Sequence, residues 1–308
     1  MEKLLDAVSE IKELYPVLIM SIIEGMNGET VEYRDVVYSY DENHTVGLVL
    51  AQLFSATNCS VSTLLKIANF NDREMHGKDC LIISRGIIES CINCCYIMSA
   101  GEEVAQASID HAISRGYRNT NKSVGKEGFS MTVKNIPEVN PTSTLSEILE
   151  KFTSKKNKPK NWTDLTVVQR IEQVYNVFGS NLATSLSSSY LMVYGDASEV
   201  IHGSLAGAQV GNGTIAFGKH PVKDKEHLDI QRKHVESSLM SSFVAVSTVV
   251  EVFSKFSGNK ELSILSARCL DLVIQHLNCK AGKPQTKKTK ECFTTILPPN
   301  SRHQTKRN

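Results

Sequence analysis

Residues 84–97 read SRGIIESCINCCYI, and this stretch decides the fold, because its apolar side chains cover nearly the whole circumference of a helix. A helix that is apolar nearly all round is normally buried within a larger assembly. Arg85, Glu89, Asn93 and Tyr96 interrupt the apolar surface at steps of four, four and three residues. Because helical residues advance by about 100° each, these polar side chains share one face, which we expect to line the interior or a cleft.

The composition is that of an ordinary soluble globular protein, with 308 residues of which 41% are hydrophobic and 22% charged. The length is sufficient for one large domain or two small ones, with a real core. The net charge of +1 provides no global field that selects a nucleic acid or a membrane, so an anionic partner would have to meet a local patch. The eight cysteines show no disulfide framework, which favours free thiols in a reducing cytosol. We therefore expect a cytoplasmic protein.

Metal, cofactor and membrane sites are all disfavoured by the sequence. Cys91, Cys94 and Cys95 lack a second Cys or His pair at ligand spacing, so buried apolar thiols are a better interpretation than a metal site. The glycine-rich residues 202–213 lack the phosphate-loop pattern, and we expect no cofactor. No apolar run reaches the roughly 18 residues of a membrane span, and the acidic, amphipathic N-terminus has no secretory pattern. We therefore expect no membrane partner.

Helical periodicity recurs along most of the chain and predicts an all-α fold. We expect an up-and-down array of about seven or eight helices in a single domain over residues 1–279. Pro16 should kink or divide the first helix, and Thr163 or Asp164 should cap the helix that follows them. The predicted helical segments are 1–27, 45–69, 72–100, 102–119, 162–178, 181–202, 225–256 and 259–279.

Three segments depart from this helical pattern. Residues 119–161 are polar, basic and rich in helix breakers around one short amphipathic piece, and we interpret them as a surface excursion. Residues 204–222 are glycine-rich, and an Asn-Gly pair between short apolar runs predicts a small β-hairpin inserted after the His202 helix. Residues 280–308 form a basic tail that we expect to be disordered, because it cannot bury enough apolar surface.

A second polar stripe lies near the end of the predicted helix over residues 181–202. It recurs at four-residue steps and consists of Tyr190, Tyr194, Ser198 and His202. Burying ionised groups without partners is costly, so the economical arrangement brings the two stripes together. We predict that Arg85 pairs with Glu89. We also predict that Asn93 and Tyr96 bond across to hydroxyl or imidazole groups of the second stripe.

The two stripes admit two interpretations. In the first, the polar network only fixes the order and register of the helices, as buried polar groups sometimes do. In the second, the stripes line a cleft in which Arg85 holds an anion with its planar guanidinium fork. His202 would then serve as an acid or base, because histidine titrates near neutral pH, and Gly203 after it favours a helix end with an accessible imidazole.

Three motifs resemble a bacterial family of unknown function, DUF5677. SRGIIESCINCCYI resembles the R-x3-E-x3-N-x2-Y helix of that family, and NWTDLT at residues 161–166 resembles its tryptophan-bearing segment. YGDASEVIHGS at residues 194–204 resembles its late Y-x3-S-x3-H-G-S motif. The order and approximate spacing agree, and the resemblance covers roughly residues 45–220. It implies an all-helical fold without a firmly assigned activity.

The late motif also resembles, more weakly, the R-x(4–6)-H segment of HEPN nucleases. No arginine precedes His202 at that spacing, so Arg85 would supply the guanidinium from another helix. The resemblance implies a candidate endoribonuclease that needs no metal, in which the RNA 2′-hydroxyl attacks the adjacent phosphate. His202 would act as general acid or base, Arg85 would stabilise the phosphorane-like charge, and Glu89 would orient Arg85. The implied substrate-binding residues are Asn93, Tyr96, Tyr190, Tyr194 and Ser198.

The same resemblance implies a role as an RNA-cleaving or RNA-binding effector in bacterial antiviral defence or a toxin system. The implied partners are RNA, a cognate antitoxin or defence protein, and a second copy of the chain in a homodimer. Basic stretches over residues 155–160 and 280–307 would attract RNA phosphates, or else serve only as solvated flexible segments. The alternative function is a non-enzymatic helical interaction or regulatory module in which both polar stripes are structural.

Overall fold

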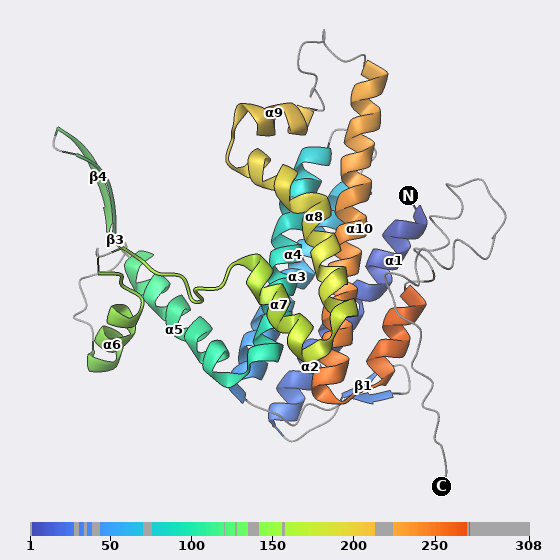
Figure 1. Cartoon of the computed structure of the whole chain (residues 1–308), viewed down its shortest axis with the longest axis horizontal. Coiled ribbons are helices and arrows are strands. Elements are labelled where there is room, and N and C mark those ends of the chain that lie inside the picture. Colours follow the sequence, from blue (N-terminus) through green and yellow to red (C-terminus); the bar gives the residue numbers. More distant parts are fainter. Residues whose placement is uncertain are drawn as a thin grey trace.

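The computed structural model confirms the all-α fold (Figure 1). It describes residues 2–27, 31–33, 36–38, 44–69, 76–119, 121–126, 128–134, 142–155, 158–212, 224–269 and 271. The helices are α1 Glu2–Lys12, α2 Leu14–Met26, α3 His44–Ala68, α4 Gly77–Ala100, α5 Glu102–Asn119, α6 Ser143–Lys151, α7 Val167–Phe178, α8 Ser180–Ile201, α9 Leu205–Asn212 and α10 Asp224–Ser257. Residues 261–269 add a last helical segment. The β structure of the described residues is two antiparallel hairpins, β1 Val31–Tyr33 with β2 Val36–Tyr38 and β3 Asn121–Lys126 with β4 Phe129–Lys134.

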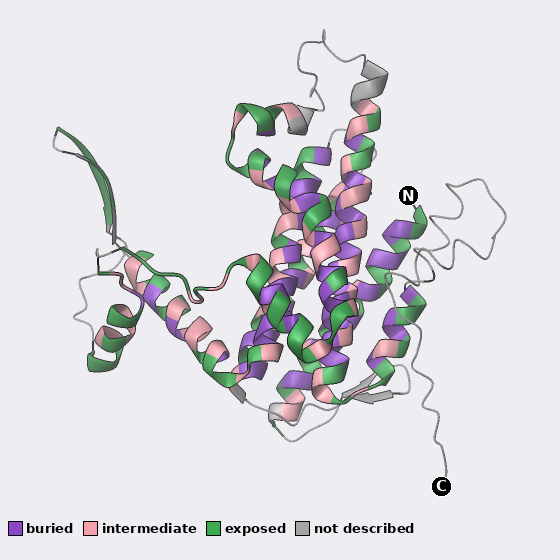
Figure 2. Ribbon diagram, viewed as in Figure 1, coloured by how far each residue is buried: buried purple, intermediate pink, exposed green. Residues whose placement is uncertain are grey.

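Helix α4 is the centre of the bundle, and it packs against α3, α7, α8 and α10 (Figure 1). The apolar circumference of residues 84–97 predicted burial, and this prediction is confirmed, because Ile87, Ile88 and Ile92 are all inaccessible to solvent. Buried residues are concentrated along these central helices, whereas the outlying β3–β4 hairpin is exposed (Figure 2). Burial of α4 on several sides therefore organises the fold.

The contact between α4 and α10 is close because small residues line it. The hydroxyl of Ser84 donates to the carbonyl oxygen of Ser238 at 3.1 Å or pairs with the hydroxyl of Ser242 at 2.9 Å. At the first turn of α4, a Cβ atom on Gly77 would lie 2.9 Å from the backbone oxygen of Gln231 and 3.0 Å from the Cβ of His234. The absence of a side chain at Gly77 therefore lets α4 and α10 approach each other closely.

The cysteines of α4 are buried free thiols, as the sequence predicted. Burial raises the pKa of the Cys80 thiol to about 12. Burial also raises the pKa of the Cys91 thiol to about 12, although a hydrogen bond with Tyr15 acts in the opposite direction. The pKa values of Cys94 and Cys95 are raised well above the ordinary value by the same burial. Because the thiolate is the reactive form, these side chains act as small apolar groups.

Two predicted helix boundaries need correction. The N-terminal pair divides at Glu13 rather than at Pro16, which lies in the first turn of α2. A proline is tolerated there because the first backbone N–H groups of a helix have no intrahelical acceptor. Helix α7 is capped by Thr166, not by Thr163 or Asp164, because Thr166 and Gln169 form a reciprocal capping box.

The predicted excursion over residues 119–161 consists of the β3–β4 hairpin, α6 and an isolated β-bridge between Thr153 and Pro159. This part stands away from the bundle at the far end of α5 (Figure 1). Arg118 fastens it to α5, because its Nη2 atom donates to the carbonyl oxygen of Phe152 at 3.0 Å and to the hydroxyl of Thr153 at 2.6 Å. The described residues of the hairpin itself are exposed, as expected for a surface segment.

The hairpin predicted after His202 is replaced in its first half by helix α9, so this part of the prediction is wrong. Ser204 explains the helix, because its hydroxyl accepts a hydrogen bond from the backbone N–H of Gly207 at 2.9 Å. The remainder of the segment, residues 213–223, lies outside the described residues, as does the predicted tail over 280–308.

Helices α3, α4 and α10 are long and apolar enough to cross a membrane, by length and composition alone. This finding corrects the expectation that no segment reaches that threshold. The most apolar windows of α4 and α10 are 61% and 67% buried within the bundle, whereas that of α3 is 33% buried. The apolar character of α4 and α10 therefore corresponds to core packing.

Substituting Gly77→Ala should destabilise the protein by about 1–3 kcal/mol, because the new Cβ meets the backbone of α10 and the helices must separate. Gly86→Ala in the same helix is the matched control, since a Cβ there meets nothing within 4 Å. That control should stabilise by about 0.5–1 kcal/mol through helix propensity. Denaturant unfolding measures the free energy of unfolding of both variants. An unchanged free energy of unfolding in Gly77→Ala would contradict the close approach of α4 and α10.

A thiol reagent at mildly alkaline pH should label Cys59, which is exposed, and leave Cys80, Cys91, Cys94 and Cys95 unlabelled in the native protein. The raised pKa values keep the buried thiols protonated, and burial excludes the reagent. Mass spectrometry after proteolysis identifies the labelled sites, and the denatured protein, labelled at every cysteine, is the control. Rapid native labelling of Cys91 would show that this core is open.

Candidate functional site

The two predicted polar stripes meet in part, through Arg85 and Tyr194, where α4 packs against α8. The Nη2 atom of Arg85 on α4 donates a hydrogen bond of 3.1 Å to the hydroxyl of Tyr194 on α8. The guanidinium carbon of Arg85 lies 4.5 Å from the centre of the same ring, within the range of a cation–π interaction. Tyr190 packs beside Tyr194 with ring centres 4.3 Å apart. The sequence therefore identified correctly which two helices contribute polar side chains to this contact.

The predicted pairing of Arg85 with Glu89 is wrong. Tyr194 is the partner of Arg85, and among the ion pairs of the described residues none joins Arg85 to Glu89. An acid placed four residues after a base is the weaker orientation of a helical ion pair, and Tyr194 offers both a ring face and a hydroxyl. Glu89 is half-buried and stays within electrostatic range of Tyr190.

Asn93 and Tyr96 face α7 and the segment before it, rather than the second stripe. The Oδ1 atom of Asn93 accepts a short hydrogen bond from Nη1 of Arg170 on α7. The ring of Tyr96 lies 5.8 Å from that of Trp162, and the guanidinium carbon of Arg170 lies 6.0 Å from the same Trp162 ring. The prediction that Asn93 and Tyr96 bond to α8 is therefore wrong, because α7 covers this part of α4.

Arg170 is the functional candidate that sequence reasoning missed. Its side chain is only 7% exposed, although it carries a full charge. The signal was present in the sequence, because Arg170 lies on the same face of amphipathic α7 as the buried Ile171 and Val174. A charged residue on the apolar face of a helix requires a partner in the core. In the structure, Asn93 is that partner of Arg170.

Two buried guanidinium N–H groups lack acceptors in this cluster. Within the described part of the chain, the Nε atoms of Arg85 and Arg170 are buried and have no hydrogen-bond partner. Leaving a charged donor unpaired is costly, and an anion entering the cluster would supply the missing acceptors. Burial raises the pKa of Tyr190, as do Tyr194 and Glu89, whereas Arg85 and Arg170 lower it.

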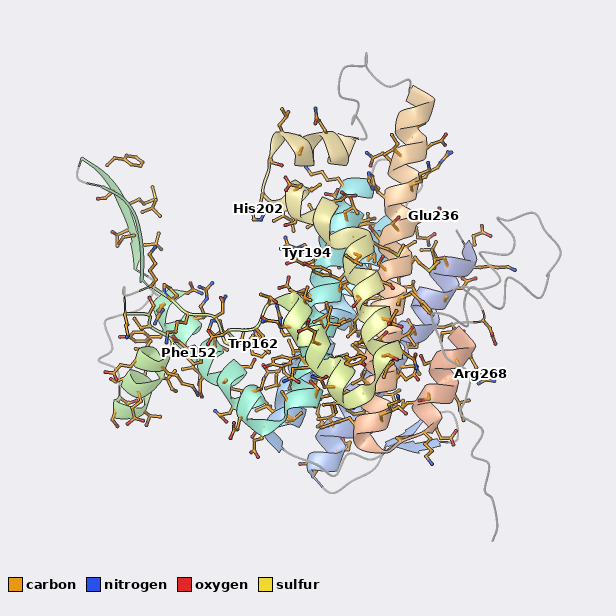
Figure 3. All side chains as sticks on the ribbon, viewed as in Figure 1. Phe152, Trp162, Tyr194, His202, Glu236 and Arg268 are labelled. Carbon is orange, nitrogen blue, oxygen red and sulfur yellow. The ribbon has the colours of Figure 1, made fainter. Side chains whose placement is uncertain are left out.

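His202 lies apart from this cluster. It is exposed and forms the C-cap of α8, eight residues after Tyr194, which corresponds to about 12 Å along the helix axis. Figure 3 shows Tyr194 along α8 and His202 at the end of that helix. Ser198 is half-buried between them, and its carbonyl oxygen accepts from the backbone N–H of His202 at 3.1 Å. Among the described residues, no hydrogen bond joins Arg85 to His202.

The described residues contain no group of three or more His, Cys, Asp or Glu side chains that could hold a metal ion. The chemistry available in the cluster is therefore that of two cations, an amide, a carboxylate and several aromatic rings. Such a set can bind an anion and stack against a planar group.

The match to a family model agrees with the family resemblance of the motifs that form this cluster. A model of the family described as a family of unknown function, DUF5677, matches residues 47–213. That span runs from α3 to α9 and includes Arg85, Arg170 and His202. Comparisons with curated proteins and with solved structures gave no match. Since the matched residues make up more than half of the chain, the protein belongs to the DUF5677 family.

Proposed function

We propose that this protein is an RNA-binding effector that holds phosphate-bearing RNA at the contact of α4, α7 and α8. The observation that carries the proposal is the pair of buried arginine Nε groups, at Arg85 and Arg170, that lack acceptors in the described chain. The setting in bacterial antiviral defence or a toxin system follows from the HEPN resemblance.

Phosphate is the anion that best fits this cluster. A guanidinium is a planar, permanently charged fork that binds phosphate oxygens in pairs. Arg85 is half-buried and so remains reachable, whereas Arg170 is nearly inaccessible and acts as a positioning residue through Asn93. If a phosphate bound at Arg85, the guanidinium would donate to the charged phosphate oxygens, which are stronger acceptors than the hydroxyl of Tyr194.

The aromatic rings around the arginines favour a nucleic acid over a free phosphate ion. Trp162, Tyr190 and Tyr194 are each half-buried, so each keeps part of its surface open. Stacking of a base on an aromatic side chain contributes about 1–3 kcal/mol in single-strand binding proteins. The exposed Lys158 and Lys160, which precede Trp162 in the chain, add positive charge on the approach to the site.

The geometry supports RNA binding more strongly than cleavage by one chain. A general base must lie within hydrogen-bond reach of the proton that it removes, and His202 is about 12 Å from Tyr194 along α8. A strand held at Arg85 would meet His202 only by running along α8 to its end. Cleavage with His202 as acid or base and Arg85 as stabiliser of the same phosphate therefore remains the narrower form of the proposal.

A structural role is the second candidate function, and specific contacts favour it. The bond from Arg85 to Tyr194 joins α4 to α8, and that from Arg170 to Asn93 joins α4 to α7. In that case the protein would be a non-enzymatic helical interaction or regulatory module, and the polar cluster would only fix the order of three helices.

Arg85→Ala should weaken binding of single-stranded RNA by about tenfold or more, because a charged hydrogen bond to phosphate contributes roughly 1.5–3 kcal/mol. Fluorescence anisotropy of labelled RNA at several salt concentrations measures the affinity. The affinity of the variant should depend less steeply on salt concentration than that of the wild type. Lys260→Ala, at an exposed position in the turn after α10, is the control. His202→Ala, assayed for cleavage of labelled RNA, tests the narrower proposal.

Thermal melting separates binding from structure. Tyr194→Phe removes only the hydroxyl that Arg85 donates to and keeps the ring. If the cluster binds RNA, this variant should melt within a few degrees of the wild type and retain its affinity. A sharp fall in the melting temperature of Tyr194→Phe and of Arg85→Ala, with unchanged RNA affinity in the folded fraction, would replace the proposal by the structural role.

A further inference from the structure

Glu89 is a half-buried carboxylate on the polar face of α4. Among the described residues, no hydrogen bond or ion pair engages it. Its oxygens are not among the buried polar atoms that lack a partner, so they are accessible to solvent. An ionised carboxylate accepts hydrogen bonds and donates none. Glu89 therefore presents an accessible pair of acceptors within the arginine cluster.

Asn93, one turn further along the same face, presents a donor. The Oδ1 atom of its amide accepts from Nη1 of Arg170. Because a guanidinium only donates, this bond fixes the orientation of the amide and leaves Nδ2 as the group that faces elsewhere. In the described part of the chain, Nδ2 forms no hydrogen bond, and it is not one of the buried atoms without a partner. Nδ2 is therefore accessible beside the acceptors of Glu89.

Arg85, Glu89 and Asn93 follow one another at intervals of four residues on α4. Side chains at this spacing have Cβ atoms about 5–6 Å apart, and they are offset by about 40° around the helix. The face thus presents a cation, then two acceptors, then a donor. A complementary ligand carries an anion at one end, and two donors beside an acceptor at the other.

Aromatic rings of α8 and of the segment before α7 lie beside this face. Tyr190 of α8 is half-buried and within electrostatic range of Glu89. Trp162 is half-buried, and its ring lies 6.0 Å from the guanidinium carbon of Arg170, which holds Asn93. A flat ring placed against Glu89 and Asn93 can therefore stack on an aromatic side chain.

We propose that Glu89 and Asn93 recognise a guanine base of the RNA whose phosphate Arg85 holds. The inference rests on the proposed RNA-binding function and names the base that the site selects. The Watson–Crick edge of guanine carries an acceptor, O6, beside two donors, N1–H and the N2 amino group. The Glu89 carboxylate accepts from both donors, and Nδ2 of Asn93 donates to O6.

The other three bases present a different edge to the same two side chains. Adenine has an acceptor, N1, where guanine has N1–H, and cytosine has the acceptors N3 and O2. Uracil has a single donor, N3–H, between two carbonyl oxygens. Each of these bases turns at least one lone pair toward the Glu89 carboxylate, and a polar group left unpaired in a site is costly. Selection therefore comes from repulsion of the wrong base as well as from hydrogen bonds to the right one.

Fluorescence anisotropy with the full chain and labelled single-stranded RNA tests the proposal. The probes are short uridine oligonucleotides that carry guanosine, inosine or adenosine at the centre. The guanosine probe should bind about tenfold or more tightly than the adenosine probe, because hydrogen bonds to a charged acceptor are the strong ones. Inosine keeps O6 and N1–H but lacks the N2 amino group, so its affinity should lie between the two.

Glu89→Gln should abolish the preference for guanosine without lowering the affinity for all-uridine RNA. Its thermal melt should match the wild type, since no hydrogen bond or ion pair of the described residues engages Glu89. Asn93→Asp keeps an oxygen for Arg170 and replaces the Nδ2 donor by an acceptor, so it should also remove the preference. Glu172→Gln, at an exposed position of α7, is the matched control and should retain it.

Guanosine monophosphate distinguishes a base within RNA from a free nucleotide. Trp162 is the single tryptophan of the chain, and its place beside Tyr96 and Arg170 makes its fluorescence a probe of the cluster. The mononucleotide should bind more weakly than guanosine-containing RNA, because it lacks the neighbouring phosphates and bases. Binding at least as tight as that of the RNA would identify a free guanine nucleotide as the ligand and overturn the RNA source.

Three further results would overturn the proposal. If guanosine, inosine and adenosine probes bind equally and Arg85→Ala still weakens all of them, the RNA-binding function stands and base recognition is removed. An equal gain in affinity for every probe in Glu89→Gln would show that the carboxylate only repels phosphate. The absence of binding to any RNA would remove base recognition together with the proposed function.

Discussion

Burial of α4 on several sides is the constraint on which the rest of the structure depends. Its apolar side chains can leave water only if α3, α7, α8 and α10 surround it, and this requirement assembles helices that are far apart in the chain. Burial also forces every polar group on α4 to find a partner within those helices, since an unpaired buried charge is costly. Arg85 and Asn93 therefore define where α8 and α7 dock.

The polar cluster follows from that packing and remains incompletely satisfied. Arg85 reaches Tyr194, and Arg170 reaches Asn93, yet both arginines keep a buried Nε without an acceptor in the described chain. A purely structural network would be expected to satisfy its members. A buried Nε without an acceptor, beside half-buried aromatic rings, favours an anion-binding role for the cluster. The exposed His202 at the end of α8 stands apart from it.

The surface carries a second kind of incompleteness. Val124, Phe129 and Met131 of the β3–β4 hairpin and Leu191 and Met192 of α8 are exposed apolar side chains that the described bundle does not cover. Single exposed apolar residues are ordinary, whereas grouped ones indicate contact sites.

The sequence by itself determined the all-α class, the burial of residues 84–97, and which polar side chains share a face of each helix, because helical periodicity is a local property. Local capping also overrode the Asn-Gly turn signal, since Ser204 begins α9 where a hairpin was expected. Only the tertiary structure decided the partners. Arg170 rather than α8 meets Asn93, and Tyr194 rather than Glu89 meets Arg85, because the side chain opposite a given face depends on how distant helices pack, which no local pattern encodes.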